Sequence, residues 1–253
     1  MEENTKRQYL YGMHPVLEAV RTGKKFDKVL LRQGLENPQF RELMELLQKN
    51  GIPYQFVPVE KLNHTVRGAH QGVIACIASI DYISIEEMVD TALAVTPSPL
   101  IAILDGVSDV RNLGAISRTL ECAGGNGIIV PAKGGAAINA DAIKSSAGAL
   151  MRIGISKVPN LRYAVYYLKQ SGFNIVAATE KADGSIYGAD MTGPCAVIMG
   201  SEGRGISQSV LSLADVRASI PMSGEISSLN VSAAAAVVLF EAVRQRQAKG
   251  NVK

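Results

Sequence analysis

Four segments of the chain combine glycines with small polar or charged residues, and each follows a short apolar run. They are DGVSDVRNLGAISR, ATEKADG, GSEGRG and IPMSGEISSLNVS. Glycine has no side chain, so backbone amides in such segments can approach a ligand closely. In the first segment, the guanidinium of Arg118 suits bidentate contact with a phosphate. In the third, the carboxylate of Glu202 lies between glycines and could meet Asn112, Arg118 or the backbone. Composition alone is equally consistent with ordinary turns between strands and helices.

Several familiar catalytic signatures are absent. The sequence has no GxGxxG opening a first helix, no HExxH and no GxSxG, and GSEGRG lacks the Lys-Ser/Thr of a P-loop, which disfavours a nucleotide triphosphatase. All three histidines fall in the first third of the chain. The three cysteines, Cys76, Cys122 and Cys195, are far apart, which argues against disulfides and thiolate zinc sites. We expect no metal site, and we expect each cysteine to be a small core residue.

Downstream of residue 99, continuous apolar runs alternate with segments of helical spacing. The runs are PLIAILDGV, GIIVP, FNIVAAT, CAVIMG and SIPM, and a final helix is expected from about Ser228 to Gln247. This alternation is typical of a parallel sheet covered by helices on both faces. Ligands of such sheets bind beyond the carboxyl ends of the strands, where the four segments described above are expected to lie.

The first 80 residues predict a smaller α/β domain. HPVLEAVRTG has helical spacing, and NPQFRELMELLQKNG has Asn37 as a candidate N-cap, Pro38 at the first helical position and a closing Gly51. FDKVLLRQG, IPYQFVPV and GVIACIASI read as strands, and KLNHTVRGAHQG reads as a polar, turn-rich stretch. The periodic pattern weakens between residues 81 and 99, where AVTPSPL contains two prolines. We therefore expect a domain at 1–80, a linker at 81–98 and a second domain at 99–253.

The net charge of the 253 residues is only +3, and 47% of the residues are hydrophobic. This composition is typical of a folded protein and excludes a polycationic nucleic-acid binder. No apolar run approaches the ~20 residues that cross a bilayer, and MEENTKRQYL lacks the apolar core of a signal peptide, so a cytoplasmic protein is expected. Residues 1–80 carry 11 Lys+Arg and 8 Asp+Glu, whereas residues 81–253 carry 15 of each sign. The excess of positive charge is therefore in the N-terminal third.

Three ordered motifs resemble those of the SpoU/TrmH family of RNA ribose 2′-O-methyltransferases. They are Asn112-x-Gly114-x-x-x-Arg118, IMGSEGRGIS and IPMSGEISSLNVSAAAAVVLFEA. YGMHPVLEAV and HQGVIA resemble the substrate-binding domain of one branch of the family, the large-subunit (23S) rRNA guanosine 2′-O-methyltransferases. The resemblance implies an N-terminal domain like ribosomal protein L30e, a C-terminal α/β SPOUT domain with a parallel sheet and a trefoil knot, and a homodimer.

The resemblance also implies S-adenosylmethionine as the methyl donor, held in the knot loops. Gly200, Ile220 and Leu229 would hold it through backbone groups, and Met199, Met222, Ser228 and Asn230 would flank it; either methionine could instead be core filler. The full set of expected cofactor-binding residues is Thr179, Met199, Gly200, Gly205, Ile220, Met222, Ser228 and Leu229.

The expected reaction is in-line attack of a ribose 2′-hydroxyl on the sulfonium methyl, so the protein must align two atoms and manage one proton. Asn112 can cap the following helix, which places Gly114 in its first turn, beside Arg118, with room for an RNA backbone. Because a guanidinium stays protonated, we interpret Arg118 as an orienter, with an RNA phosphate or Glu202 taking the proton. Glu202 could equally pair with Arg118. The expected catalytic set is Asn112, Arg118, Glu202, Ser228 and Asn230.

Cations in the N-terminal domain are accompanied by few aromatic residues, which favours contacts with RNA phosphates and RNA shape over base stacking. The candidate RNA contacts are Lys24, Lys25, Lys28, Arg32, His64, Arg67 and His70, with Arg111 in the second domain. A target in tRNA or at another rRNA site, or a catalytically silent RNA-binding protein, is an alternative function. Ala233 to Ala236 form a small-residue surface that could be a dimer contact or part of the core.

Overall fold

The computed structural model describes residues 9–250 except 25, 78–79, 183 and 226–227. The boundary between its two compact units falls between Asp81 and Tyr82. Within the described ranges, no helix is both long enough and apolar enough to cross a membrane.

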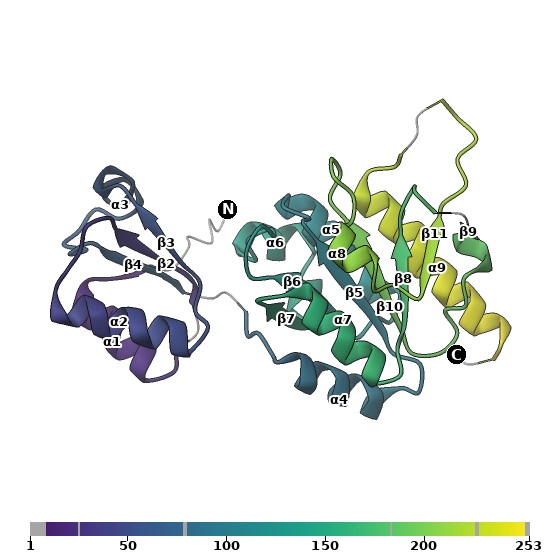
Figure 1. Ribbon diagram of the computed structural model, residues 1–253, viewed down its shortest axis with the longest axis horizontal. Helices are drawn as coiled ribbons and strands as arrows, with labels where there is room; N and C mark the ends of the chain where they lie inside the picture. Colours follow the sequence, from purple (N-terminus) through teal and green to yellow (C-terminus); the bar gives the residue numbers. More distant parts are fainter. Residues whose placement is uncertain (1–8, 25, 78–79, 183, 226–227, 251–253) are drawn as a thin grey trace. The chain divides into compact units, whose positions relative to one another are not determined.

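The N-terminal unit is a four-stranded mixed sheet with helices on both faces (Figure 1). Its strand order is β1-β4-β2-β3, with β2 and β3 parallel and the other pairs antiparallel. Helices α1 and α2 cover one face through a core that includes Leu17 and Leu43, and Leu62 of α3 packs on the other face. The elements are β1 (Tyr9–Tyr11), α1 (Met13–Arg21), β2 (Phe26–Arg32), α2 (Pro38–Lys49), β3 (Tyr54–Val57), α3 (Val59–Thr65) and β4 (Val73–Ile77).

Two local predictions for this unit have opposite outcomes. The N-cap prediction for α2 is confirmed, because the Asn37 side chain accepts a hydrogen bond from the Phe40 amide at 2.7 Å. The turn-rich interpretation of KLNHTVRGAHQG is wrong for its first residues, which belong to α3. This helix spans seven residues and buries only Leu62, so no apolar repeat could reveal it.

The C-terminal unit contains the predicted parallel sheet. Its strand order is β7-β6-β5-β10-β8-β11-β9, and every described pairing is parallel. The trefoil knot stays a prediction. The helices are α4 (Ile85–Val95), α5 (Val110–Cys122), α6 (Ala140–Ser145), α7 (Leu161–Gln170), α8 (Gln208–Leu211) and α9 (Val231–Ala248), with short 3-10 helices at Ala149–Met151 and Ile186–Gly188. The strands are β5 (Leu100–Asp105), β6 (Gly127–Pro131), β7 (Gly154–Val158), β8 (Asn174–Ala178), β9 (Gly184–Ser185), β10 (Cys195–Gly200) and β11 (Val216–Ser219).

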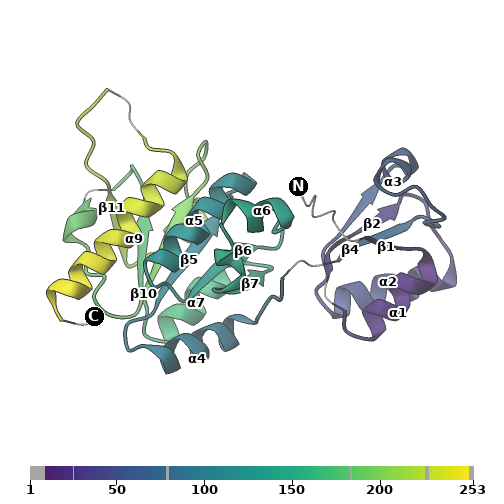
Figure 2. The ribbon, with the colours of Figure 1, turned by 180° about the vertical axis from the view of Figure 1, so that it is seen from behind.

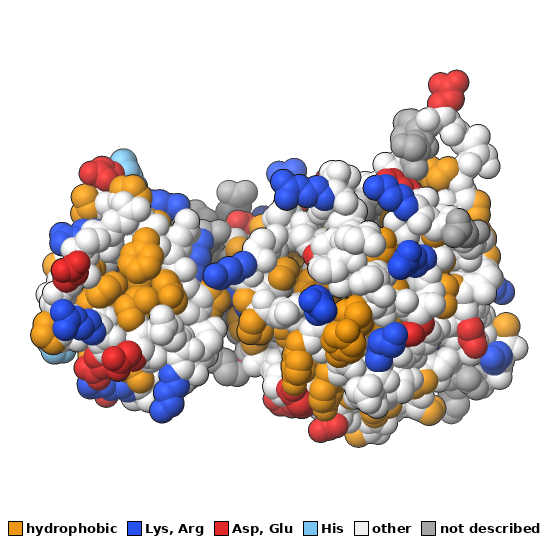
Figure 3. Space-filling model, viewed as in Figure 1, with side chains coloured by type: hydrophobic (Ala, Val, Ile, Leu, Met, Phe, Trp, Pro, Cys, Tyr) orange, Lys and Arg blue, Asp and Glu red, His pale blue; other side chains and the backbone are white. Residues whose placement is uncertain are grey.

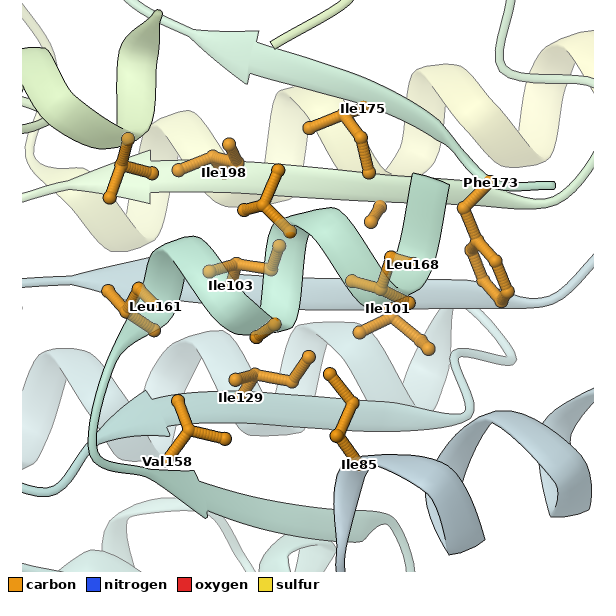
Figure 4. Close-up of a cluster of buried hydrophobic side chains, with 14 of the residues drawn as sticks. Ile85, Ile101, Ile103, Ile129, Val158, Leu161, Leu168, Phe173, Ile175 and Ile198 are labelled. Atoms are coloured by element: carbon orange, nitrogen blue, oxygen red, sulfur yellow. The ribbon is translucent and has the colours of Figure 1, made fainter. Parts of the chain in front are cut away.

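Both faces of this sheet are buried, which explains the continuous apolar runs. Helices α4 and α7 lie over one face, and α5 and α9 lie over the other (Figures 1 and 2). Side chains that alternate along the strands divide between the two faces. Ile101 and Ile103 of β5, Ile198 of β10 and Ile175 of β8 pack against Leu168 of α7 and the residues around it (Figure 4).

The expected linker at 81–98 is wrong for most of its length. Residues Ile85–Val95 form α4, and Ile85, Met88 and Val89 join the core beneath α7. Ser84 caps this helix by accepting a hydrogen bond from the Glu87 amide at 3.0 Å. The sequence pattern looks weak because α4 is a surface helix whose one apolar stripe is followed closely by Pro97 and Pro99.

The cysteines are not all core residues as expected. Cys76 and Cys195 are buried, but Cys122, the last residue of α5, is exposed. Burial raises the pKa of the Cys195 thiol to about 12 and disfavours the reactive thiolate.

We therefore expect one rapidly alkylated thiol in the folded protein at pH 8, that of Cys122, with Cys195 unreactive until the chain unfolds. Mass spectrometry after brief iodoacetamide treatment tests this, with Cys122→Ser as the control that should abolish fast labelling. Rapid modification of Cys195 in the folded chain would contradict the packing described here.

Candidate active site

Three loops meet at the carboxyl end of the sheet. β5 and β10 are parallel neighbours, with Gly200 opposite Asp105, so the loops that follow them start side by side. The Ser207 amide donates to Oδ2 of Asp105 at 2.7 Å and fastens the second loop to the first. The third segment, residues 220–230, leads from β11 to α9.

A carboxylate joins these loops. The side-chain amide of Asn112 donates to Oε1 of Glu202 at 3.0 Å, and that of Asn230 donates to the same oxygen. Asn230 Nδ2 also lies 3.1 Å from Asn112 Oδ1. Asn112, Glu202 and Asn230, called here the Glu202 cluster, are three of the five residues expected to be catalytic.

Asn230 is fixed from its other side by α9. Its Oδ1 accepts hydrogen bonds from the Ser232 amide at 2.9 Å and the Ala233 amide at 3.4 Å, which makes it the N-cap of that helix. Because the oxygen faces the helix, the amide nitrogen must face Glu202. Ser228, which also precedes the helix, makes no cap hydrogen bond and is exposed.

Contrary to expectation, Asn112 does not cap α5. The cap is Asp109, whose carboxylate accepts from the amides of Arg111 and Asn112 at 2.7 and 3.1 Å. Asn112 therefore lies within the first turn, and its side chain is free to reach Glu202. Asp109 is a functional-site residue that the sequence reading missed, although an aspartate before a helical pattern is an N-cap signal.

Gly114 also does not leave room for an RNA backbone, contrary to expectation. A Cβ at this position would lie 1.9 Å from Oγ of Ser145, so the glycine accommodates α6 rather than an RNA backbone. Arg118, one turn later, is exposed and forms no hydrogen bond or ion pair with any described residue. The possible pairing of Glu202 with Arg118 is not formed, and the guanidinium is open to an external anion.

All eight residues expected to bind the cofactor line one cavity of about 200 Å³. Met199, Ile220 and Leu229 supply apolar wall, while Glu180 and Lys181 add charged groups. The backbone groups of Ile220, Met222 and Leu229 hydrogen-bond to no described residue, which leaves them available to a ligand. A pocket with apolar walls and open backbone donors and acceptors fits a nucleoside that carries an amino-acid chain.

Only glycine fits at position 200, which lines this cavity. A Cβ on Gly200 would lie 2.2 Å from the carbonyl carbon of Gly205, so only a hydrogen fits there. Gly205 has a φ of +67°, and its amide and carbonyl bond Ser201 at 2.9 and 3.1 Å, which closes the GSEGRG segment into a tight turn.

A second cavity of about 560 Å³ adjoins the first. Residues 201–204 and Val231 line both cavities, and Asn112 and Asp109 line the second. Glu202 thus lies where the two cavities meet, and Asn112 borders the second. Arg204, which the sequence reading did not single out, borders both.

The candidate RNA contacts of the N-terminal unit fall into two groups. Lys24, Arg32, His64 and Arg67 are exposed, as is Arg111 in the C-terminal unit, while Lys28 is half-buried and Lys25 lies outside the described residues. His70 is buried, and its Nδ1 accepts from the Gly72 amide at 3.0 Å while its Nε2 lies 2.8 Å from Oδ1 of Asn63. Both ring nitrogens are occupied within the protein, so its position favours holding the HQG turn over direct contact with RNA.

The chain matches two known protein-family models, which divide it between them. Residues 99–240 match the SpoU rRNA Methylase family, and residues 9–83 match the family described as RNA 2′-O ribose methyltransferase substrate binding. Together these matches define a methyltransferase with a separate substrate-binding unit. The chain belongs to the SpoU methylase family.

Individual relatives agree with this assignment. The 23S rRNA (guanosine-2′-O-)-methyltransferase RlmB of Pseudomonas putida is 37% identical, over 95% of this chain and 97% of its own. YacO of Bacillus subtilis, a TrmH family tRNA/rRNA methyltransferase by name, is 31% identical over 97% and 99%. The SpoU methyltransferase AviRb of Streptomyces viridochromogenes, solved with AdoMet, superposes with a TM-score of 0.59 at 26% identity, covering 95% of this chain and 90% of that one.

Replacing Gly200 by alanine should close the cofactor cavity, because the added methyl group forces the 201–205 turn away from β10. We expect S-adenosylmethionine affinity to fall at least about tenfold, equivalent to about 1.4 kcal/mol, by isothermal titration calorimetry. Gly188→Ala is the matched control, since a Cβ there meets nothing within 4 Å. Wild-type affinity in Gly200→Ala would show that this turn is not part of the binding site.

Proposed function

We propose that this protein transfers a methyl group from S-adenosylmethionine to the 2′-hydroxyl of a ribose in 23S rRNA, with guanosine as the nucleotide. The observation that carries the proposal is the pair of adjoining cavities: one lined by all eight expected cofactor residues, the other bordered by Asn112. Guanosine and 23S rRNA rest on similarity to a relative with that name, which aligns along nearly the whole chain.

S-adenosylmethionine, when bound, supplies an activated methyl group, so the chain's own residues have to position the acceptor. Gly200, Ile220 and Leu229 would hold the cofactor through their backbone groups. The acceptor ribose would enter the second cavity beside Asn112 and Glu202. Holding the two reactants in one geometry is a large part of the catalytic effect in such a transfer.

Glu202 acts chiefly by positioning. Its Oε1 already accepts two amide hydrogens, from Asn112 and Asn230, and this arrangement holds the loop of the cofactor cavity against the starts of α5 and α9. The 2′-hydroxyl proton would pass to an RNA phosphate. The free, exposed guanidinium of Arg118 would orient that phosphate with two parallel hydrogen bonds.

The proposal includes a homodimer formed through α9. This helix is apolar on nearly all sides up to Ala242, and Ala233, Ala236, Val237 and Phe240 form a stripe that α5 does not bury, with Phe240 48% exposed. A helix that is hydrophobic all round normally has both faces covered.

Transfer of labelled methyl from S-adenosylmethionine to a 23S rRNA transcript, followed by mapping of the modified ribose, tests the function. Arg118→Lys keeps the positive charge but loses the planar fork, so we expect kcat/KM to fall about tenfold with unchanged cofactor affinity. A tRNA transcript runs in parallel. Methylation of tRNA alone would overturn the rRNA assignment, transfer to neither RNA would overturn the activity, and full activity of Arg118→Lys would overturn the role of the fork.

A further inference from the structure

An exposed cation follows each of five neighbouring strands of the C-terminal sheet. The strands lie in the order β7-β6-β5-β10-β8. Their carboxyl ends point to one edge because they are parallel, so the residues that follow them are arranged along that edge. In the same order, these carboxyl-edge cations are Arg162, Lys133, Arg111, Arg204 and Lys181.

None of these five side chains forms an ion pair or a hydrogen bond with another residue in the described part of the chain. Three carboxylates at the same edge have donors of their own: Asp105 accepts from the Ser207 amide, Asp109 caps α5, and Glu202 accepts from two side-chain amides. The cations therefore keep their hydrogen-bonding capacity for an external partner.

At the opposite edge of the sheet, where the strands begin, cations form ion pairs. There Arg152 pairs with Glu121 at 3.5 Å, Lys169 with Asp215 at 2.6 Å, and Arg244 with Glu241 at 2.7 Å. The neutral total of the C-terminal part thus conceals an asymmetry: ion-paired cations at the amino edge and open cations at the carboxyl edge.

The carboxyl-edge cations also border the candidate active site. Arg204 lines both cavities, and Lys181 lines the first. The loop that carries Lys133 is held beside the second cavity by the Ala136 amide, which donates to the carbonyl of Val107 at 2.8 Å. With strands about 4.8 Å apart, five strands extend the row over roughly 19 Å. Figure 3 shows Lys and Arg side chains outnumbering Asp and Glu over the part of the C-terminal unit around α6 and α7.

We propose that the carboxyl-edge cations bind successive phosphates of the RNA strand on both sides of the acceptor nucleotide. This inference rests on the proposed function and deepens it, because it gives the catalytic unit an RNA-binding surface of its own. Exposed Asp141 and Glu180 lie at the same edge, so the attraction is local pairing with phosphates rather than net charge. The charges of the sequence by themselves favour the N-terminal third, which holds the excess of positive charge.

The test compares full-length Lys133→Gln, Arg162→Gln and their double variant with two controls from the amino edge, Arg152→Gln and Lys169→Gln. Binding to the 23S rRNA transcript is measured across salt concentrations. Each lost phosphate contact should reduce the slope of log K against log salt by about 0.7 for a single strand. We expect the double variant to lose about 1.4 in slope by the same rule and to bind RNA several-fold more weakly, with S-adenosylmethionine affinity unchanged.

Slopes for Lys133→Gln and Arg162→Gln that match those of the two controls and the wild type would overturn the proposal. Failure of the proposed function would give a different result. The wild-type chain would then transfer no methyl group to the transcript, whatever the salt dependence of RNA binding in the variants. Wild-type transfer together with unchanged slopes in the variants would remove only the carboxyl-edge cations from RNA binding.

Discussion

One carboxylate connects segments that are far apart in the sequence. Oε1 of Glu202 accepts hydrogen bonds from Asn112 in the first turn of α5 and from Asn230 at the start of α9. Both bonds are exposed to solvent, so each is weaker than a buried charged hydrogen bond, but together they link three segments in one geometry. Because Asn230 also caps α9, its side chain connects the start of that helix directly to Glu202.

The two cavities follow from this arrangement. The turn that contains Glu202 separates them, and its path is fixed by Gly200, where no side chain fits, and by the left-handed backbone of Gly205. The cofactor side combines Met199, Ile220 and Leu229 with the charged Glu180 and Lys181, whereas the acceptor side is bordered by Asp109 and Asn112, and Arg204 borders both. Methyl donor and RNA strand would therefore approach the same turn from different sides.

The sequence predicts the parallel sheet because continuous apolar strands depend on local composition. The expected residues of the first cavity come instead from the resemblance of three motifs to the SpoU/TrmH family. It does not predict partnerships across the fold. Both Asp109 and Asn112 are chemically able to cap α5. In the structure Asp109 is the cap, and the side chain of Asn112 bonds to Glu202, 90 residues further along the chain. Gly114 similarly faces Ser145 of α6 instead of open space. His70 is expected to contact RNA, but it is buried and both of its ring nitrogens are bonded within the protein.

Reversing the donor and acceptor between positions 202 and 230 tests the central claim most directly. Asn230→Asp keeps the oxygen that caps α9 but removes the donor to Glu202, and adding Glu202→Gln restores a donor from the other side. If the cluster acts by positioning, kcat/KM for RNA methylation in the double variant should exceed that of Asn230→Asp by about tenfold, equivalent to about 1.4 kcal/mol. A double variant no more active than Asn230→Asp would contradict the account and indicate that the Glu202 carboxylate takes part in the chemistry itself.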